Sequence, residues 1–302
     1  MRPAAGWLFA LLISPAACAT PLDFSDFSAP WLFRLSGSAT YVDPHTLRLT
    51  PAAESQSGGV WLADKIDLSL GLDVVFRFRI SNLGGWPVDW STPPSPGADG
   101  LAFVVQNYQP APVGTPNSGI GYMGIPSSIS VEFDTWRNKP ETSAQALLYC
   151  DEGQPAPQGL EVYCEPDANH ISVHSLGEHP NRPEHRPVEV ETGVYQNPDL
   201  GTVTTGIPME DGQIHMARIT YGSDVLAVYL DDLTTPKLSV FVSVPALIGA
   251  PDNEAWIGVV AATGGAWAFH DLVQAEVIPI PEASTAVAVA LGLCLLALRR
   301  ER

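Results

Sequence analysis

Residues 131–138 read Val-Glu-Phe-Asp-Thr-Trp-Arg-Asn, with apolar and acidic side chains alternating at the start of the stretch. This alternation is typical of a β-strand with one buried face, because successive side chains point to opposite sides of a sheet. We therefore expect Phe133 to point into a core and Glu132 and Asp134 to lie side by side on the other face. Adjacent carboxylates repel each other unless a positive charge lies between them. The stretch predicts a strand that carries a cation site, and its oxygen ligands favour calcium or manganese.

The same two-residue period recurs along the chain, and clusters of glycine, proline, serine and aspartate such as 91–100 separate the runs. One run places four apolar side chains on a single face, namely Val74, Phe76, Phe78 and Ile80. The runs expected to form strands are 72–80, 101–105, 129–134, 171–174, 214–221, 225–230, 238–242, 255–261 and 272–277. With no persistent helical period and no fixed repeat, the sequence predicts an all-β, single-domain antiparallel sandwich of about 12 strands.

Composition excludes several classes of protein. Hydrophobic residues make up 45% of the 302 residues and charged residues 16%, which is too apolar for a disordered chain. Acidic residues outnumber basic ones by 33 to 15, so the net charge is −18. Nucleic acid and anionic membrane surfaces repel such a chain. We therefore expect no nucleic-acid partner.

The N-terminus reads as a targeting segment. Met-Arg-Pro precedes an apolar run over residues 7–13, and Ala17-Cys18-Ala19 follows with small residues at both positions that a signal peptidase reads. This arrangement is typical of a secretory signal peptide, which we assign to residues 1–19. The domain itself is expected to begin at residue 20 and to end at residue 278.

The C-terminal segment, residues 279–302, resembles the PEP-CTERM sorting tail of Gram-negative bacteria, which the membrane enzyme exosortase reads. Pro281-Glu282-Ala283 is followed by an apolar run over residues 286–298 and by terminal arginines. A plain C-terminal membrane anchor is the alternative, although the apolar run is short for a full span. Either interpretation predicts an exported protein, extracellular or on the cell surface, held transiently in the inner membrane by this segment.

Two cysteines remain between these terminal segments, Cys150 and Cys164. An oxidising compartment favours a disulfide between them. Such a bond closes a small loop and is expected to stabilise the fold by roughly 3 kcal/mol through loop entropy.

The 131–138 strand and its surroundings resemble the bacterial branch of the legume-type (L-type) lectin family. The shared pattern is glutamate-aromatic-aspartate-threonine-aromatic, an asparagine two residues on, and then an acidic residue and a histidine. The resemblance implies a concanavalin-like jelly roll and a site for calcium and manganese, or another divalent transition metal. The implied ligands are Glu132, Asp134, the Trp136 carbonyl, Asn138, Glu165, Asp167 and His170. Glu165 and Asp167 compete for one acidic position, where the family usually has aspartate followed by proline.

The resemblance also implies a carbohydrate site. Residues 98–103, Ala-Asp-Gly-Leu-Ala-Phe, match a family motif. In the family, the aspartate follows a cis peptide bond and accepts hydrogen bonds from two sugar hydroxyls. Tyr122 or Trp267 is expected against the apolar face of the sugar ring. The glycines are implied as backbone N–H donors, and homodimers are common in the family. The residues implied for sugar binding are Asp99, Gly121, Asn138, Gly264 and Gly265.

Four histidines follow the metal motif and raise the question of a zinc site. They are His170, His174, His179 and His185. Their spacings match no common zinc pattern. Because residues 179–187 read as a loop, we expect His179 and His185 to be solvated.

Two other functions compete with sugar binding. Glycosidases of the laminarinase-like jelly-roll type place a second glutamate after the glutamate and aspartate of this strand, to act in acid–base catalysis. Arg137 follows Trp136 here, and a guanidinium cannot act as a general acid at neutral pH. We therefore predict that the protein is not an enzyme. The third possibility is a structural matrix protein that keeps the sandwich without binding sugar.

Overall fold

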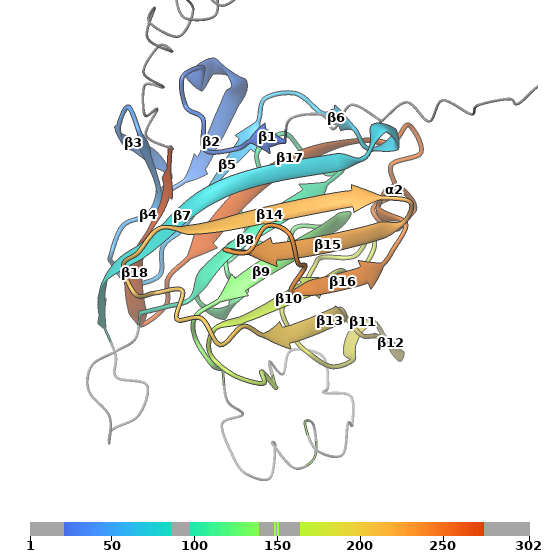
Figure 1. The fold of residues 1–302 in the computed structure, drawn as a ribbon. Helices are drawn as coiled ribbons and strands as arrows, with labels where there is room; N and C mark the ends of the chain where they lie inside the picture. The colour runs from blue at the N-terminus through green and yellow to red at the C-terminus, as the bar shows by residue number, and fades with distance from the viewer. Residues whose placement is uncertain (1–20, 86–96, 139–147, 149, 151–163, 275–302) are drawn as a thin grey trace, which may run out of the picture.

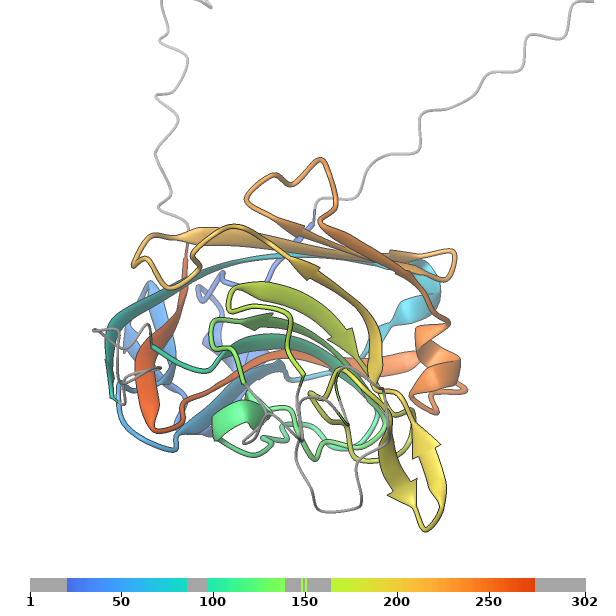
Figure 2. The same ribbon diagram turned by 90° about the horizontal axis from the view of Figure 1, so that it is seen from below.

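The computed structural model describes residues 21–85, 97–138, 148, 150 and 164–274. Two eight-stranded sheets pack face to face as stacked, curved layers (Figures 1 and 2). The predicted all-β sandwich is therefore confirmed. A separate hairpin pairs β11 (Val188–Glu191) with β12 (Val194–Gln196). The described part of the chain contains one α-helix, the single turn α2 (Val244–Leu247).

The first sheet lies in front in Figure 1, and its longest strand is β7. Another short strand, β1 (Leu22–Asp23), pairs in parallel with β7 at its side. The order across the sheet is β16 (Leu238–Phe241), β15 (Val225–Leu230), β14 (His215–Gly222), β7 (Leu72–Gly85), β18 (Ala266–Val273), β4 (Thr46–Thr50) and β3 (Thr40–Asp43).

The second sheet carries the 131–138 motif near its middle. A short strand, β6 (Ile66–Asp67), pairs with β17 at one end. The order is β13 (Asp199–Thr204), β10 (His170–His174), β9 (Ser128–Asp134), β8 (Gly100–Gln106), β17 (Glu254–Ala262), β5 (Ser57–Leu62) and β2 (Phe33–Gly37). This order places the entry to β8 beside the end of β9, so that Gly100 pairs with Asp134 although the two are distant in sequence.

The core joins the two sheets through aromatic side chains. Phe133 on β9 is fully buried, and its ring centroid lies 5.9 Å from that of Phe76 and 5.7 Å from that of Phe78, both on β7. The alternation predicted for β9 is thus observed, with Phe133 in the core and its acidic neighbours on the opposite face. A core substitution at this point affects both layers at once.

The closing strand differs from its prediction. It spans Ala266–Val273 and so begins six residues before the predicted run 272–277, whose last three residues lie outside the described part of the chain. Two buried polar residues, His270 and Asp271, interrupt its apolar pattern and obscured the strand in the sequence. The Asp271 carboxylate is neutralised by Arg48, whose Nε lies 2.7 Å from it, so this charge is tolerated in a strand.

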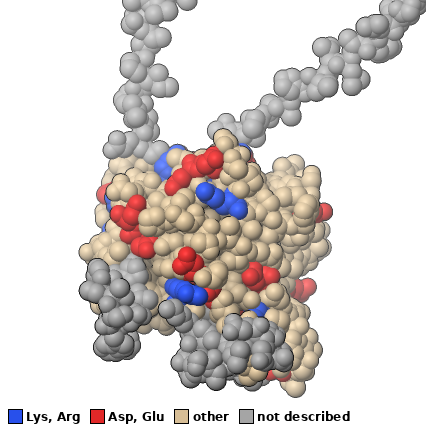
Figure 3. All heavy atoms as spheres, turned by 60° about the horizontal axis from the view of Figure 1, so that its bottom comes forward, with Lys and Arg blue, Asp and Glu red and all other residues tan. Residues whose placement is uncertain are grey.

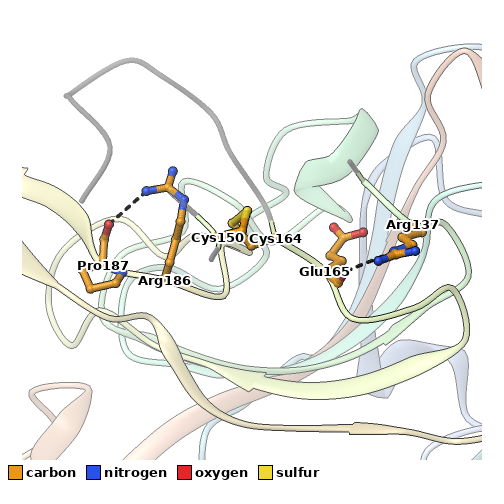
Figure 4. The surroundings of a disulfide bond; sticks show 6 residues. All are labelled: Arg137, Cys150, Cys164, Glu165, Arg186 and Pro187. Carbon is orange, nitrogen blue, oxygen red and sulfur yellow. Dashed lines mark hydrogen bonds between the residues drawn. A yellow bond between two sulfur atoms is a disulfide. The ribbon is translucent and has the colours of Figure 1, made fainter. Parts of the chain in front are cut away.

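Chain segments predicted to lie outside the fold, residues 1–19 and 279–302, lie outside the described residues as well. Among the described residues, no helix is long and apolar enough to cross a membrane. The disulfide between Cys150 and Cys164 is present, as predicted (Figure 4).

Candidate metal and ligand site

Three neighbouring strands bring the predicted metal residues together on the face of the second sheet that turns away from the core. The register of β9 and β10 sets His170 opposite Asp134 and Ser172 opposite Glu132. Strand β8 sets Gly100 opposite Asp134 on the other side. Glu132 is 1% exposed and Asp134 2% exposed, so both carboxyl groups are removed from solvent. Antiparallel pairing therefore assembles the site from segments that are distant in sequence.

The Glu132 carboxylate lies at the centre of a histidine cluster. Its Oε1 is 3.3 Å from His170 Nε2, 3.1 Å from His174 Nε2 and 3.7 Å from His185 Nε2. Ser172 donates its hydroxyl to the same oxygen, and Tyr122 donates to Oε2 at 2.7 Å. Burial opposes ionisation, but the charge of His174 and the histidine hydrogen bonds hold the pKa of Glu132 well below its ordinary value.

The histidines themselves respond in different ways to this environment. Burial opposes the charged form of His170, but its hydrogen bond to Glu132 and the Asp134 charge raise its pKa to about 9. Burial lowers the pKa of His185, against the hydrogen bond that it makes with Asp199. Two imidazoles around one carboxylate thus differ in protonation because their other partners differ.

His185 is not the solvated residue that the sequence predicted. Its side chain is 6% exposed, and its loop folds back over the sheet to reach Glu132. Among the described residues, one group of three potential ligands has donor atoms that all lie within 4.8 Å of one another, and it consists of Glu132, His170 and His185. The expectation of solvation was wrong because loop closure, which no local spacing encodes, brings this histidine inward.

A second group forms around Asp134 and Glu165. Asp134 Oδ1 accepts the Trp136 backbone N–H at 2.6 Å, and the Asn138 backbone N–H donates to the Glu165 carboxylate. The Asn138 amide also faces this carboxylate, and its nitrogen donates over 2.9 and 3.2 Å when turned toward it. In Figure 4, Arg137 reaches the Glu165 backbone carbonyl, with Nε 3.2 Å away.

Glu165, and not Asp167, points its carboxylate toward this group. Glu165 is 4% exposed, whereas Asp167 is an exposed residue. The Asp167 backbone carbonyl nevertheless contributes, because it faces His170 Nδ1 at 2.8 Å. The structure thus places the two competing acidic residues in different positions.

The buried carboxyl groups of Asp134 and Glu165 are repelled by the negative charges of their acidic neighbours. Burial first, and then the negative charges of their acidic neighbours, raise the pKa values of Asp134 and Glu165 well above normal. Burial raises the pKa of Asp99 to about 8. A divalent cation would remove this repulsion, and carboxylate, amide and carbonyl oxygens are the ligands that calcium prefers. Asp134, Glu165, Asn138 and the Trp136 carbonyl therefore fit a calcium ion chemically.

Asp99 lies beside this group at the entry to β8. It follows a cis Ala98–Asp99 peptide bond, as the resemblance implied. The residue is 4% exposed, and its Oδ2 has no hydrogen-bond partner among the described residues. A Cβ built on Gly264 would lie 3.2 Å from this Oδ2 and 3.1 Å from Asn117 Oδ1. The missing side chain at Gly264 thus leaves room next to an unused acceptor.

Two of the glycines implied as backbone donors use their N–H groups within the protein. Gly121 donates to the Thr115 carbonyl at 3.1 Å, and Gly264 donates to the Ala266 carbonyl at 3.0 Å. These assignments are corrected accordingly, because the turns around both glycines consume the donors. Gly265 is exposed, and its N–H has no hydrogen bond within the described part of the chain.

The expected aromatic partners of the sugar also separate. Tyr122 is fully buried beneath the site, where its hydroxyl holds Glu132. It cannot stack on a ligand from there. Trp267 is partly exposed and packs beside Gly84, where a Cβ would lie 2.5 Å from the indole nitrogen. Of the two, Trp267 alone keeps an accessible ring.

Residues 24–275 match the legume lectin β-barrel domain. The chain belongs to this family. Three solved structures share its fold, each with a TM-score of 0.52. The VIP36 exoplasmic/lumenal domain in its Ca²⁺/Man3GlcNAc-bound form is 16% identical and covers 83% of this chain and 87% of its own. The basic winged bean lectin with Tn-antigen is 19% identical, at 80% and 90% coverage. The Bauhinia forficata lectin in complex with GalNAc is 18% identical, at 82% and 93% coverage.

A curated relative matches part of the chain more closely in sequence. The pesticidal crystal protein Cry22Aa of Bacillus thuringiensis is 36% identical over 111 residues, which are 36% of this chain and 14% of that protein. The match thus concerns one segment of a much longer protein. Membership of the lectin family indicates a carbohydrate-binding protein and not an enzyme.

Proposed function

We propose that this member of the legume lectin family is a secreted lectin that binds a sugar at the entry to β8. The observation that carries the proposal is the Asp99 carboxylate, whose Oδ2 is buried, has no partner among the described residues and lies beside the Cβ-free Gly264. A buried acceptor without a partner is costly unless a ligand or water completes it. Sugar hydroxyls are donors of the required kind.

Cations would order the loops around this acceptor. Asp134, Glu165, Asn138 and the Trp136 carbonyl would hold calcium, and Glu132 and His170 would contribute to a transition-metal position, which manganese fills in the family pattern. The cations would supply positive charge against the repelling carboxylates. The Asn138 amide offers one acceptor and two donors, so it can serve a cation and a sugar together.

The remaining contacts follow from what is accessible. Asp99 would accept from two hydroxyls of one sugar ring, and the Gly265 N–H would donate to a third. Trp267 would cover the apolar face of the ring, a contact that aromatic side chains provide well. This division of roles differs from the sequence expectation because Tyr122, Gly121 and the Gly264 N–H are already engaged.

The surface favours a neutral ligand. On the face in Figure 3, the few basic side chains of the described residues lie beside acidic ones. Three arginine–aspartate pairs make contacts of 2.7 Å, namely Arg48–Asp271, Arg77–Asp23 and Arg218–Asp73. With a net charge of −18, the protein would be repelled by strongly anionic polymers. A neutral exopolysaccharide of the producing cell is therefore the proposed ligand.

The proposed location is outside the cytoplasm of a Gram-negative bacterium. Residues 1–19 support export, and residues 279–302 support exosortase-dependent sorting after a transient inner-membrane stage. A homodimer is part of the proposal only by analogy with the family.

Binding of the purified protein to a glycan array in calcium tests the proposal. We expect binding that disappears with a chelator and in Asp99→Asn, since the amide is no longer a charged acceptor for two hydroxyls. The matched control is Asp64→Asn, which removes the charge of an exposed carboxylate outside the proposed site. This variant should bind glycan like the parent. Glycan binding by Asp99→Asn as strong as that of the parent would reject Asp99 as the sugar acceptor. A parent protein that binds neither metal nor glycan would favour the alternative of a structural matrix protein without sugar binding.

A further inference from the structure

We propose that the transition-metal position is a zinc site whose side-chain ligands are Glu132, His170 and His185. This ligand set differs from the oxygen-rich manganese set that the family resemblance implies, in which Asp134 and a second acidic residue take part. The inference deepens the proposed function and rests on it only in assuming that a metal orders this end of the sheet.

The spacing of the donor atoms brings three side chains within reach of one zinc ion, because the donors of Glu132, His170 and His185 all lie within 4.8 Å of one another. Zinc ligands lie about 2.0–2.1 Å from the metal in a tetrahedron, so neighbouring ligand atoms are about 3.3–3.4 Å apart. The Nε2 atoms of His170 and His185 lie 3.3 and 3.7 Å from Glu132 Oε1, close to this separation. Tyr122 occupies the other oxygen, Oε2, at 2.7 Å. Oε1 is thus the oxygen that faces all three imidazoles.

The outer nitrogens of two histidines are fixed by acceptors. His170 Nδ1 lies 2.8 Å from the Asp167 carbonyl, and His185 Nδ1 lies 3.1 Å from Asp199 Oδ2. An acceptor at Nδ1 places the proton there and leaves the Nε2 lone pair for a metal, the arrangement that zinc-binding histidines show. A metal ion at Nε2 of His170 would take the place of the proton that this nitrogen otherwise directs at Glu132 Oε1, 3.3 Å away.

His185 Nε2 is the observation that separates a metal site from a packed polar cluster. The side chain is 6% exposed, and Nε2 has no hydrogen-bond partner among the described residues. This nitrogen nevertheless points to within 3.7 Å of Glu132 Oε1. Buried polar atoms without partners are rare in proteins, so an unused nitrogen aimed into a cluster of metal-binding groups indicates a missing ligand.

The chemistry of the donors favours zinc over manganese. Imidazole suits zinc, copper and nickel, whereas carboxylate, carbonyl and water suit calcium and manganese. Asp134, which both metals would share in the family pattern, does not belong to the group of donors within 4.8 Å, and its Oδ1 accepts the Trp136 N–H. Three protein ligands with a fourth position left open are a common arrangement of zinc, and Glu132, His170 and His185 supply that number.

A cavity provides access to this cluster. It has a volume of about 290 Å³, and its walls include His185, Asp199 and Thr202. His185 thus lies between the cavity and Glu132, with one ring nitrogen toward each side. A metal ion could enter here without opening the sheet.

Metal competition on the full chain tests the inference. Metal-stripped protein is equilibrated with equimolar Ca²⁺, Mn²⁺ and Zn²⁺ and desalted, and its metal content is measured by mass spectrometry. We expect one zinc per chain, and Co²⁺ in place of zinc should give the intense visible absorption of a four-coordinate ion. His185→Gln should lose the zinc, whereas His179→Gln, a change in the same loop, should keep it.

Two further variants separate this site from the family arrangement and from misfolding. Asp199→Asn changes no ligand atom and should weaken zinc binding by about 10–100-fold, so it remains informative if His185→Gln fails to fold. Asp134→Asn should keep its zinc. Manganese in place of zinc, zinc retained by folded His185→Gln, or zinc lost from folded Asp134→Asn would each overturn the inference.

Sugar binding measured on the same samples distinguishes the two proposals. Zinc bound by a protein that binds no glycan would refute the lectin function and leave the zinc site standing. Calcium-dependent glycan binding by a protein that takes up no zinc would do the reverse.

Discussion

His270 shows how one buried side chain can set a pH dependence far from the proposed site. It lies on β18 in the first sheet, where Nδ1 is 2.7 Å from Thr50 Oγ1 and Nε2 has no hydrogen-bond partner among the described residues. Burial lowers the pKa of His270 to about 3. The folded protein therefore keeps this ring neutral under conditions in which an exposed histidine is charged.

Because of this residue, the free energy of unfolding should decrease as the pH is lowered. In the unfolded chain, His270 binds a proton below its pKa of about 6.5. In the folded chain it stays neutral down to about pH 3, so acid favours the unfolded state between these two values. The contribution is complete above about pH 6.5 and is lost progressively below it. We expect the free energy of unfolding of the parent to drop by up to about 2 kcal/mol more than that of His270→Gln between pH 7.5 and pH 5. Urea denaturation at both pH values measures this difference, and parallel losses in the two proteins would refute it.

Individual residues also show what the sequence could and could not predict. Glu132 and Asp134 were predictable because strand alternation decides which way their side chains point. His185 and Asn117 were not, because they reach the site from loops whose closure depends on the whole fold. The Gly121 N–H shows the same limit, since a sequence does not reveal which carbonyl a turn brings to it.

At the scale of elements, strands β5 and β17 pack through a glycine. A Cβ on Gly258 of β17 would lie 2.4 Å from the ring of Trp61 on β5. Trp61 in turn donates its indole N–H to the Pro112 carbonyl at 2.9 Å, which ties the loop between β8 and β9 to the sheet. That loop carries Tyr122, whose hydroxyl holds Glu132. The glycine therefore supports the site through two intermediate contacts.

Gly258→Ala should destabilise the protein by about 1–3 kcal/mol, because the added methyl group must displace a fully buried tryptophan. Urea unfolding measures the change. Gly222→Ala is the matched control, since a Cβ at this exposed strand end meets no atom within 4 Å. It should stay within about 0.5 kcal/mol of the parent. Equal effects of the two substitutions would contradict the role assigned to Trp61.

Burial explains only part of the element prediction, because β4 and β5 are mostly buried and were not predicted. Strands with an apolar face, such as β7, β8 and β9, were predicted nearly to their ends. The strands at 33–37 and 40–43 were missed, because each is short and none of their residues is buried, so they show no two-residue period. The closing strand was misplaced because its buried His270 and Asp271 resemble loop residues. Polar groups satisfied by tertiary contacts thus defeat a pattern based on hydrophobicity.

The molecule as a whole should gain stability from metal. Strand β9 turns Phe133 into a core shared by both sheets and turns Glu132 and Asp134 to the opposite face, where the cations are proposed to bind. A cation at 100 times its dissociation constant stabilises the folded state by about 2.7 kcal/mol. For a domain of this size, we expect a rise of roughly 5–10 °C in Tm in a single transition.

Calorimetry with calcium and with a chelator measures this rise. Asp134→Asn should lose the calcium-dependent part, since it removes a charge from the proposed ligand set, whereas Asp64→Asn should keep it. Separate melting of the two sheets would contradict the shared core, and an unchanged Tm would contradict metal binding by the folded state.

The bond between Cys150 and Cys164 has a consequence for the order of maturation. Cys164 immediately precedes Glu165, whose carboxylate accepts a hydrogen bond from the Asn138 backbone N–H. Closing this covalent ring restricts the backbone of Glu165 before any cation arrives, and such restriction lowers the entropy lost on binding. Oxidation is therefore expected to precede calcium loading. If the proposed calcium site exists, a chain with reduced cysteines is expected to bind calcium more weakly than the oxidised chain.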